Sequence, residues 1–190
     1  MKKNKNLNLL KKLTVILLTN NSRDEFIFRA LNNYEKEYGL IKLKIIISDS
    51  GDKKKFKILR NKIKNKKYNI KIHCLNNLPK NNSINLVRDG WGKTKYEYRH
   101  RLNKSLKLVN TKYTVIAADD DFYLPNYFIK SIKFLDKHKD FGSVYGHILI
   151  FILKNFSAYG KIKKFYISKD DNPPNPWQED DNFIDRLKNL

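Results

Sequence analysis

Three consecutive aspartates follow a hydrophobic segment in the second half of the chain. Residues Val115 to Ala118 are apolar or small, and Asp119, Asp120 and Asp121 come directly after them. Adjacent carboxylates repel one another, which raises their pKa values unless a cation or several N–H donors compensate. Hard divalent cations such as Mg²⁺ and Mn²⁺ take oxygen ligands. The triplet therefore predicts either a divalent-cation site or a solvated acidic turn, and on its own it favours neither.

The remainder of the chain is strongly basic, so this acidity is local. The formal net charge is +21, from 40 Lys and Arg against 19 Asp and Glu. Only seven of the basic residues are Arg, the residue preferred for bidentate contacts to phosphates and bases. The lysines are scattered among asparagines, as in residues 62–69. This pattern indicates a solvated cationic surface for most lysines and leaves an anionic ligand open for a local subset.

The length and composition are typical of one folded domain. The chain has 190 residues, 41% of them hydrophobic, and we expect a single domain over residues 1–190 with a basic tail at 1–12. The only cysteine, Cys74, cannot form an internal disulfide, which favours a reducing, cytoplasmic setting. The apolar segments at 13–18 and 148–153 are too short for a signal-peptide core or a bilayer span. A soluble or peripheral protein is expected.

Strand-like and helix-like patterns alternate along the first 137 residues. Strands are expected at 13–19, 43–48, 69–75 and 112–118, and helices at about 22–38, 53–64, 91–109 and 125–137. The third helix is expected to bury a stripe of Tyr98, Leu102, Leu106 and Val109. This alternation predicts an α/β fold with a doubly wound, mainly parallel sheet and helices on both faces. Two longer strands, 143–153 and 159–168, are expected next, with antiparallel pairing as an option, and a short helix begins near Glu179.

Polar residues stand at the ends of three expected strands. Thr19 ends the first strand, Asp49 follows the second, and the aspartate triplet follows the fourth. Ligands of doubly wound sheets bind beyond the carboxyl ends of the strands. The sequence therefore predicts that these side chains gather at one edge of the sheet.

Several other kinds of phosphate or hydrolase site lack their motifs in this sequence. It contains no GxxxxGK[ST] loop, no GxGxxG after the first strand, and no GxSxG. The first strand is followed instead by TNNSR, without the glycine-rich loop expected of a nucleotidyltransferase. Cys74 is alone and the four histidines lack ligand spacing, so a zinc site is not supported.

Four segments together resemble the family-2-like glycosyltransferases of the GT-A fold, which transfer a sugar from a nucleotide diphosphate donor. The segments are LTVILLTNNSR, IIISDSGD, RLNKSLKLVNTKYTVIAADDDFYLP and WQEDDNFIDRL. In the family they correspond to the first strand and nucleotide-binding turn, the second strand with its base-reading Asp, the helix–strand–DxD metal motif, and the acidic motif of the catalytic base. The likeness covers nearly the whole chain, and the third segment is the most specific.

The resemblance implies roles for individual residues. Asp119 and Asp121 would hold the divalent metal, Mn²⁺ or Mg²⁺, and Asp180 would be the catalytic base of an inverting reaction. The nucleotide-sugar would be bound by Thr19, Arg23, Asp49, Asn103, Asp119 and Asp120.

Three of these assignments have ordinary structural alternatives. Asp49 could be a plain turn residue, Asn103 a helix surface residue, and Asp180 a helix-start residue that complements the helix dipole. Leu102 stands where the family often has an Arg before the Asn, so the resemblance does not assign Arg101 a role.

The function that the resemblance implies is metal-dependent glycosyl transfer to a glycan or lipid-linked acceptor in surface polysaccharide biosynthesis. The expected location is the cytoplasm, with peripheral contact at the inner face of the cell membrane. The segment from Asp121 to Asp180 is short for the family, and residues 143–190 would form a shortened acceptor side. A minimal enzyme, a truncated product and a degenerate copy remain open. The alternatives are a non-catalytic basic protein that binds nucleic acid or phosphorylated polymers, and an inactive donor-binding fragment.

Overall fold

The computed structural model describes residues 8–19, 24–51, 53–76, 95–121, 123, 127–144, 149–153 and 162–167. The chain divides into two compact units, residues 1–137 and 138–190, and each is described by itself. The expectation of a single domain over 1–190 stays a prediction. Within the expected basic tail at 1–12, Leu10 is 1% exposed and belongs to the hydrophobic core of the first unit.

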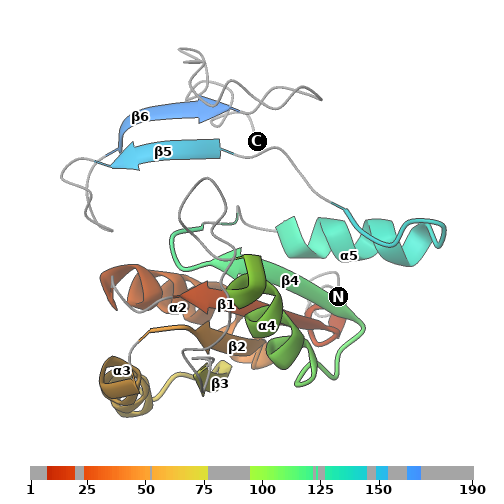
Figure 1. Cartoon of the computed structure of the whole chain (residues 1–190). Helices are drawn as coiled ribbons and strands as arrows, with labels where there is room; N and C mark the ends of the chain where they lie inside the picture. The colour runs from red at the N-terminus through yellow and green to blue at the C-terminus, as the bar shows by residue number, and fades with distance from the viewer. Residues whose placement is uncertain are drawn as a thin grey trace. The chain divides into compact units, whose positions relative to one another are not determined.

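A four-stranded, all-parallel sheet organises the first unit (Figure 1). Its strands are β1 (Leu13–Thr19), β2 (Lys44–Asp49), β3 (Lys71–Asn76) and β4 (Tyr113–Ala118). They lie in the order β3-β2-β1-β4, so β1 is an inner strand that pairs with both β2 and β4. A strand covered on both faces reads as an unbroken apolar segment, as β1 does. The predicted α/β fold with a parallel sheet is confirmed.

Helices connect these strands and cover the sheet on both faces. They are α2 (Asp24–Tyr38), the 3₁₀ turn η1 (Gly39–Ile41), α3 (Lys53–Asn65), α4 (Lys95–Leu106) and α5 (Tyr127–Lys137). Successive side chains of a strand point to opposite faces of the sheet. Val15 and Leu17 of β1 share one buried cluster with side chains of α2, α3 and α5. Ile16 and Ile46 are buried on the opposite face, and α4 lies against β2.

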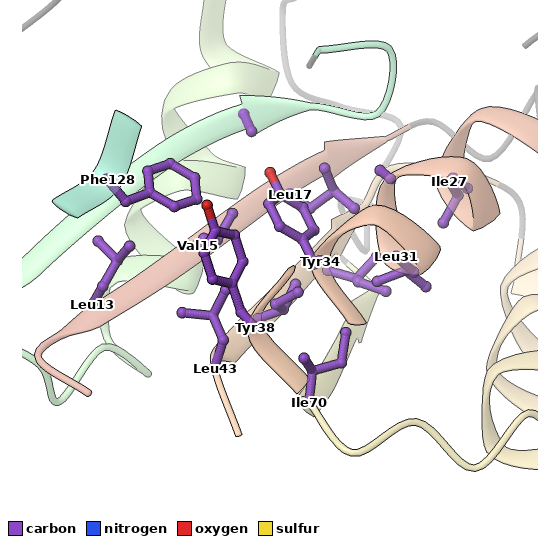
Figure 2. Packing of buried hydrophobic residues seen from close by; sticks show 14 of the residues in the cluster. Leu13, Val15, Leu17, Ile27, Leu31, Tyr34, Tyr38, Leu43, Ile70 and Phe128 are labelled. Carbon is purple, nitrogen blue, oxygen red and sulfur yellow. The ribbon is translucent and has the colours of Figure 1, made fainter. Parts of the chain in front are cut away.

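Aromatic side chains fill the part of the core between α2 and α5. Phe128 of α5 is 1% exposed, and its ring centroid lies 6.3 Å from that of Tyr34 and 5.6 Å from that of Tyr38. Figure 2 shows these rings beside Val15 and Leu17 of β1. The buried residues of α2, among them Tyr34 and Tyr38, therefore form the face that this helix turns toward the sheet.

One expectation about burial is wrong. Leu106, placed in the apolar stripe of α4, is 41% exposed, whereas Ser105 beside it is fully buried. A small residue such as Ser105 at the contact lets α4 pack closely against the sheet. In this orientation of the helix, the side chain of Leu106 points toward solvent. The apolar run that leads to the aspartate triplet is also only partly covered, because β4 lies at the edge of the four-stranded sheet and Ile116 is 41% exposed.

The second unit contains an antiparallel pair of strands. These are β5 (Leu149–Leu153) and β6 (Ile162–Ile167), both shorter than the expected strands at 143–153 and 159–168. The antiparallel option is confirmed for the described part. The helix expected near Glu179 lies outside the described residues. Among the helices that the structure describes, none has the length and apolar character to cross a bilayer.

The side chain of Asp136 links α5 to the amino-terminal edge of the sheet. Its carboxylate accepts hydrogen bonds from Lys112 Nζ at 2.6 Å, the Tyr113 hydroxyl at 2.6 Å and Lys12 Nζ at 3.3 Å. The bond from Lys112, followed by that from Tyr113, holds the pKa of Asp136 well below its usual value of 3.8. A lowered folded-state pKa adds stability above pH 3.8 that is lost as the pH falls further.

We expect Asp136→Asn to lower the melting temperature at pH 7. The variant should also lose less stability than the wild type when the pH falls below about 3.8, because it has no carboxylate to protonate. Melting curves from pH 7 to pH 2.5 provide the measurement, with the exposed Asp140→Asn as the control. Parallel acid curves for wild type and Asp136→Asn would contradict this account.

Candidate functional site

The candidate site lies at the carboxyl-terminal edge of the parallel sheet, between β1 and β4. From β1 the chain adds β2 and β3 on one side, and β4 then returns to the other side of β1. This reversal is the topological switch point, where open α/β sheets leave a crevice for a ligand. We call Thr19, Asp49, Arg101 and Asp119 the rim, because their side chains meet at this edge.

Thr19 and Asp119 are in direct contact at the switch point. The Thr19 hydroxyl donates a hydrogen bond of 2.7 Å to Asp119 Oδ2, and each residue is 4% exposed. The Asp119 N–H also donates to the Leu18 carbonyl at 3.1 Å, which extends the β1–β4 ladder by one step. The predicted meeting of these two residues is confirmed, and the first aspartate of the triplet is held rigidly by the sheet.

Asp49 has a buried carboxylate oxygen that lacks a hydrogen-bond partner among the described residues. The residue is 0% exposed, and its Oδ1 accepts the Gly51 N–H at 2.7 Å. Within the described part of the chain, Oδ2 has no hydrogen-bond partner. Burial raises the pKa of the Asp49 carboxyl, and Asp119 adds to this, while Gly51 and Arg101 partly offset it. A buried acceptor of this kind is costly unless something donates to it.

Arg101 is the rim residue to which the sequence assigned no role. From α4, its Nη2 donates to the Thr19 carbonyl at 2.6 Å and to the Ser48 carbonyl at 2.7 Å. It therefore ties the ends of β1 and β2 together, and its charge lowers the pKa of Asp49. Arg101 lies one helical turn before the buried Ser105, so both residues are on the side of α4 that faces the sheet.

Asp121 makes different contacts from those of Asp119. Asp121 Oδ2 accepts the Ala118 N–H at 2.7 Å, so this carboxylate folds back on the end of β4. Desolvation raises the pKa of Asp121, and Asp120 adds to the effect. The same carboxylate helps raise the pKa of Tyr34 and Tyr123, although burial is the larger cause for both.

Asp121 also lines a small cavity beside α2. The cavity has a volume of about 150 Å³. Its described lining consists of Ala30, Asn33, Tyr34, Lys36, Glu37, Tyr38, Asp121 and Tyr123. Asp120 is exposed, and its backbone carbonyl accepts a 3.1 Å hydrogen bond from Arg29 of α2. The turn after β4 is thus attached to α2 on one side and to the rim on the other.

The donor set fits a divalent cation that shares its coordination with a ligand. Among the residues described, no three or more His, Cys, Asp or Glu side chains are grouped closely enough to hold a metal ion. Mg²⁺ in particular usually takes one or two protein carboxylates and completes its shell with water and phosphate oxygens. Asp119 and Asp121 supply two oxygen-bearing side chains. Desolvation, with a smaller contribution from Asp120, raises the pKa of Asp121, and a nearby cation would stabilise its ionised form.

The structure adds little about the roles of the remaining predicted residues. Asn103 is an exposed residue of α4, which agrees with the ordinary alternative of a helix surface position. Arg23 and Asp180 lie outside the described residues. Their roles stay predictions.

Comparisons with protein-family models, with curated proteins and with solved structures found no match. The resemblance to glycosyltransferases therefore rests on the sequence motifs, and the structure adds to it the α/β fold and the geometry of the rim.

Proposed function

We propose that this chain is a GT-A-type glycosyltransferase that binds a nucleotide diphosphate sugar at the rim. The observation that carries the proposal is the buried Thr19–Asp119 hydrogen bond at the switch point of a parallel sheet. Asp49, which pairs with Thr19 across the β1–β2 ladder, brings a carboxylate oxygen without a hydrogen-bond partner among the described residues to the same edge. Acceptor groups at this edge suit a ligand that carries both N–H donors and hydroxyl groups.

The chemistry of Asp49 supports a nucleobase as one part of that ligand. Its buried Oδ2 can accept a hydrogen bond but, when ionised, cannot donate one. Uracil and guanine present a ring N–H that would satisfy it, whereas cytosine and adenine could donate to it on their pairing edges only through an exocyclic amine. We therefore expect uridine or guanosine diphosphate sugars to bind in preference to the cytidine and adenosine forms.

The diphosphate requires positive charge at a rim that contains carboxylates. Asp119 and Asp121 are the residues that would hold a divalent cation, and Mn²⁺ or Mg²⁺ would neutralise charge on the departing diphosphate. Arg101 holds the strand ends, and its charge lowers the pKa of Asp49. Thr19 fixes the orientation of the Asp119 carboxylate by donating to one of its oxygens.

The acceptor side of the proposal rests on the sequence. Asp180 is the proposed base that removes a proton from the acceptor hydroxyl, which makes the reaction inverting. The acceptor would be a glycan or a lipid-linked glycan, in a cytoplasmic step of surface polysaccharide assembly. The alternative is a donor-binding protein without transfer activity. A transfer assay, combined with the binding experiment below, distinguishes it from an active transferase.

Calorimetry with a panel of nucleotide sugars tests the proposal directly. Uridine, guanosine, cytidine and adenosine diphosphate sugars are titrated into wild type and Asp49→Asn, each with and without Mn²⁺. We expect Mn²⁺-dependent binding of a uridine or guanosine donor, weakened about tenfold to a hundredfold in Asp49→Asn, since one hydrogen bond to a charged group is lost. Absence of nucleotide binding under every condition would overturn the proposal.

The same variant should change stability in the opposite direction. Because the pKa of Asp49 is raised in the folded state, its ionised form destabilises the unliganded fold at neutral pH. Asparagine keeps an acceptor for the Gly51 N–H without the charge, so Asp49→Asn should melt higher than wild type at pH 7. The difference should shrink as the pH approaches 3.8, where the wild-type carboxyl also loses its charge. A lower melting temperature at pH 7 would show that Asp49 is a structural residue.

A further inference from the structure

One side of α2 lines the cavity beside Asp121. Several lining residues of this helix stand three or four positions apart and therefore share a face of it. They are Ala30, Asn33, Tyr34, Glu37 and Tyr38. Asp121 and Tyr123, which follow β4, line the cavity as well. Because Arg29 of α2 donates a hydrogen bond to the Asp120 carbonyl at 3.1 Å, the two segments that form the cavity are attached to each other.

Two buried tyrosines of this face have hydroxyl groups that the fold does not use. The rings of Tyr34 and Tyr38 pack against Phe128, with centroids 6.3 Å and 5.6 Å from its centroid. Within the part of the chain that the structure describes, neither hydroxyl makes a hydrogen bond. Both oxygens, drawn in red, point the same way in Figure 2. Because a buried tyrosine hydroxyl usually has a hydrogen-bond partner, this pair indicates that a bound molecule supplies one.

The other polar groups of the lining disfavour a strongly charged ligand. The carboxylates of Glu37 and Asp121 repel a phosphate or a nucleotide, and Lys36 opposes a small cation. The amide of Asn33 can both donate and accept hydrogen bonds, as can the hydroxyls of the tyrosines. The lining therefore suits a neutral molecule whose own groups also donate and accept.

We propose that this cavity binds a single neutral sugar ring. Its volume of about 150 Å³ equals that of about five water molecules at roughly 30 Å³ each. Sites for drug-sized ligands begin at roughly 300 Å³, so a whole nucleotide sugar is too large for the cavity, whereas one sugar ring is not. The hydroxyls of a sugar donate and accept hydrogen bonds, and its C–H faces pack on aromatic rings such as those of Tyr34, Tyr38 and Tyr123.

The sugar site differs from the donor site proposed at the rim. None of the rim residues belongs to the described lining of the cavity. Asp121 is the member of that lining that is also a proposed metal ligand. Binding of a sugar ring in the cavity requires neither a nucleotide nor a metal ion. The inference therefore does not depend on the proposed transferase activity, and it can fail while donor binding at the rim succeeds.

Titration of the ¹⁵N-labelled full-length chain, followed by NMR, tests this site. The probes are methyl glucoside, methyl galactoside and N-acetylglucosamine, added without nucleotide or divalent metal. We expect at least one of them to shift the amide resonances of residues 33–38, with a Kd of about 1–10 mM for a ligand of this size. No shift with any of the sugars at about 100 mM would overturn the proposal. Stronger binding of tetramethylammonium or inorganic phosphate to the same residues would contradict a neutral ligand.

Removal of the Tyr34 hydroxyl distinguishes a role in ligand binding from a role in the fold. Tyr34→Phe keeps the ring and its packing on Phe128, so the melting temperature should stay unchanged or rise, while sugar binding should weaken about tenfold. The matched control is Tyr68→Phe, which removes a hydroxyl that donates to Asn32 at 2.9 Å and is not part of the described lining. This control should bind the sugar like wild type. Wild-type affinity in Tyr34→Phe, an equal loss in both variants, or a lower melting temperature of Tyr34→Phe would overturn the proposal.

Discussion

Replacing Asp119 by alanine is expected to reduce sugar transfer by about a hundredfold to a thousandfold. The Asp119 carboxylate is buried, fixed by the Thr19 hydroxyl, and placed at the switch point of the sheet. A preorganised group that governs charge in such a water-poor site contributes about 10²–10³ in rate. The measurement is the initial rate of donor hydrolysis or transfer with Mn²⁺, using the nucleotide sugar that binds wild type most tightly.

Two further variants distinguish loss of chemistry from loss of structure. Asp119→Asn keeps an oxygen that can accept the Thr19 hydroxyl, so the fold should persist while the charge is absent. We expect its rate to fall nearly as far as that of the alanine variant, with an unchanged far-ultraviolet spectrum. Asp140→Asn, at an exposed carboxylate that is not part of the rim, should retain the wild-type rate. An Asp119→Asn enzyme with more than about a tenth of the wild-type rate would contradict a role for this charge.

The second large effect is expected at Arg101. Arg101→Met removes two short hydrogen bonds to strand-end carbonyls and leaves Asp49 without its nearest positive charge. Each hydrogen bond from a charged group contributes about 1.5–3 kcal/mol, and we expect a total loss of about 3 kcal/mol because both bonds are only part-buried. For a chain of this size the melting temperature would fall by roughly 6–12 °C. Lys104→Met, on the same helix, is the control and should have little effect.

A double-mutant cycle tests whether Arg101 acts through the charge of Asp49. If it does, Arg101→Met should be at least about 1 kcal/mol less costly in the Asp49→Asn background than in wild type. Denaturant unfolding of the four proteins measures this coupling. Strictly additive losses would mean that Arg101 only joins β1 to β2, and the account of Asp49 would then need another counter-charge.

The fold was largely predictable from periodicity, because most of its elements are locally encoded. The unbroken apolar residues of β1 predicted a strand at 13–19 and the structure has Leu13–Thr19. The helix expected at 53–64 is Lys53–Asn65. The sequence was misleading where packing between elements decides burial, as at Leu106. Its side chain fits an apolar stripe, yet α4 packs through Ser105 and leaves Leu106 in solvent.

The candidate site was predictable only in part. The rule that ligands bind at the carboxyl ends of parallel strands brought Thr19, Asp49 and Asp119 together correctly. Arg101 was missed because it joins α4 to the ends of β2 and β1, at residues 53 and 82 positions earlier in the chain. No spacing rule singles out one basic residue among 40 for such a contact. The direction of Asp121 was equally hidden, since a turn of three aspartates permits several hydrogen-bonding patterns.

The strand order also determines when the protein can finish folding during synthesis. Thr14 of β1 pairs with Lys44 on one side and with Thr114 on the other, 100 residues later in the chain. Chain synthesis proceeds at about 5–20 residues per second, so one edge of β1 stays unpaired for roughly 5–20 s before β4 is synthesised. The residues of β4 then pair with this edge, and Asp119 follows β4 directly in the sequence. Closure of the sheet and assembly of the rim are therefore one event, so a nascent chain remains exposed to misassembly until the moment at which it gains its binding site.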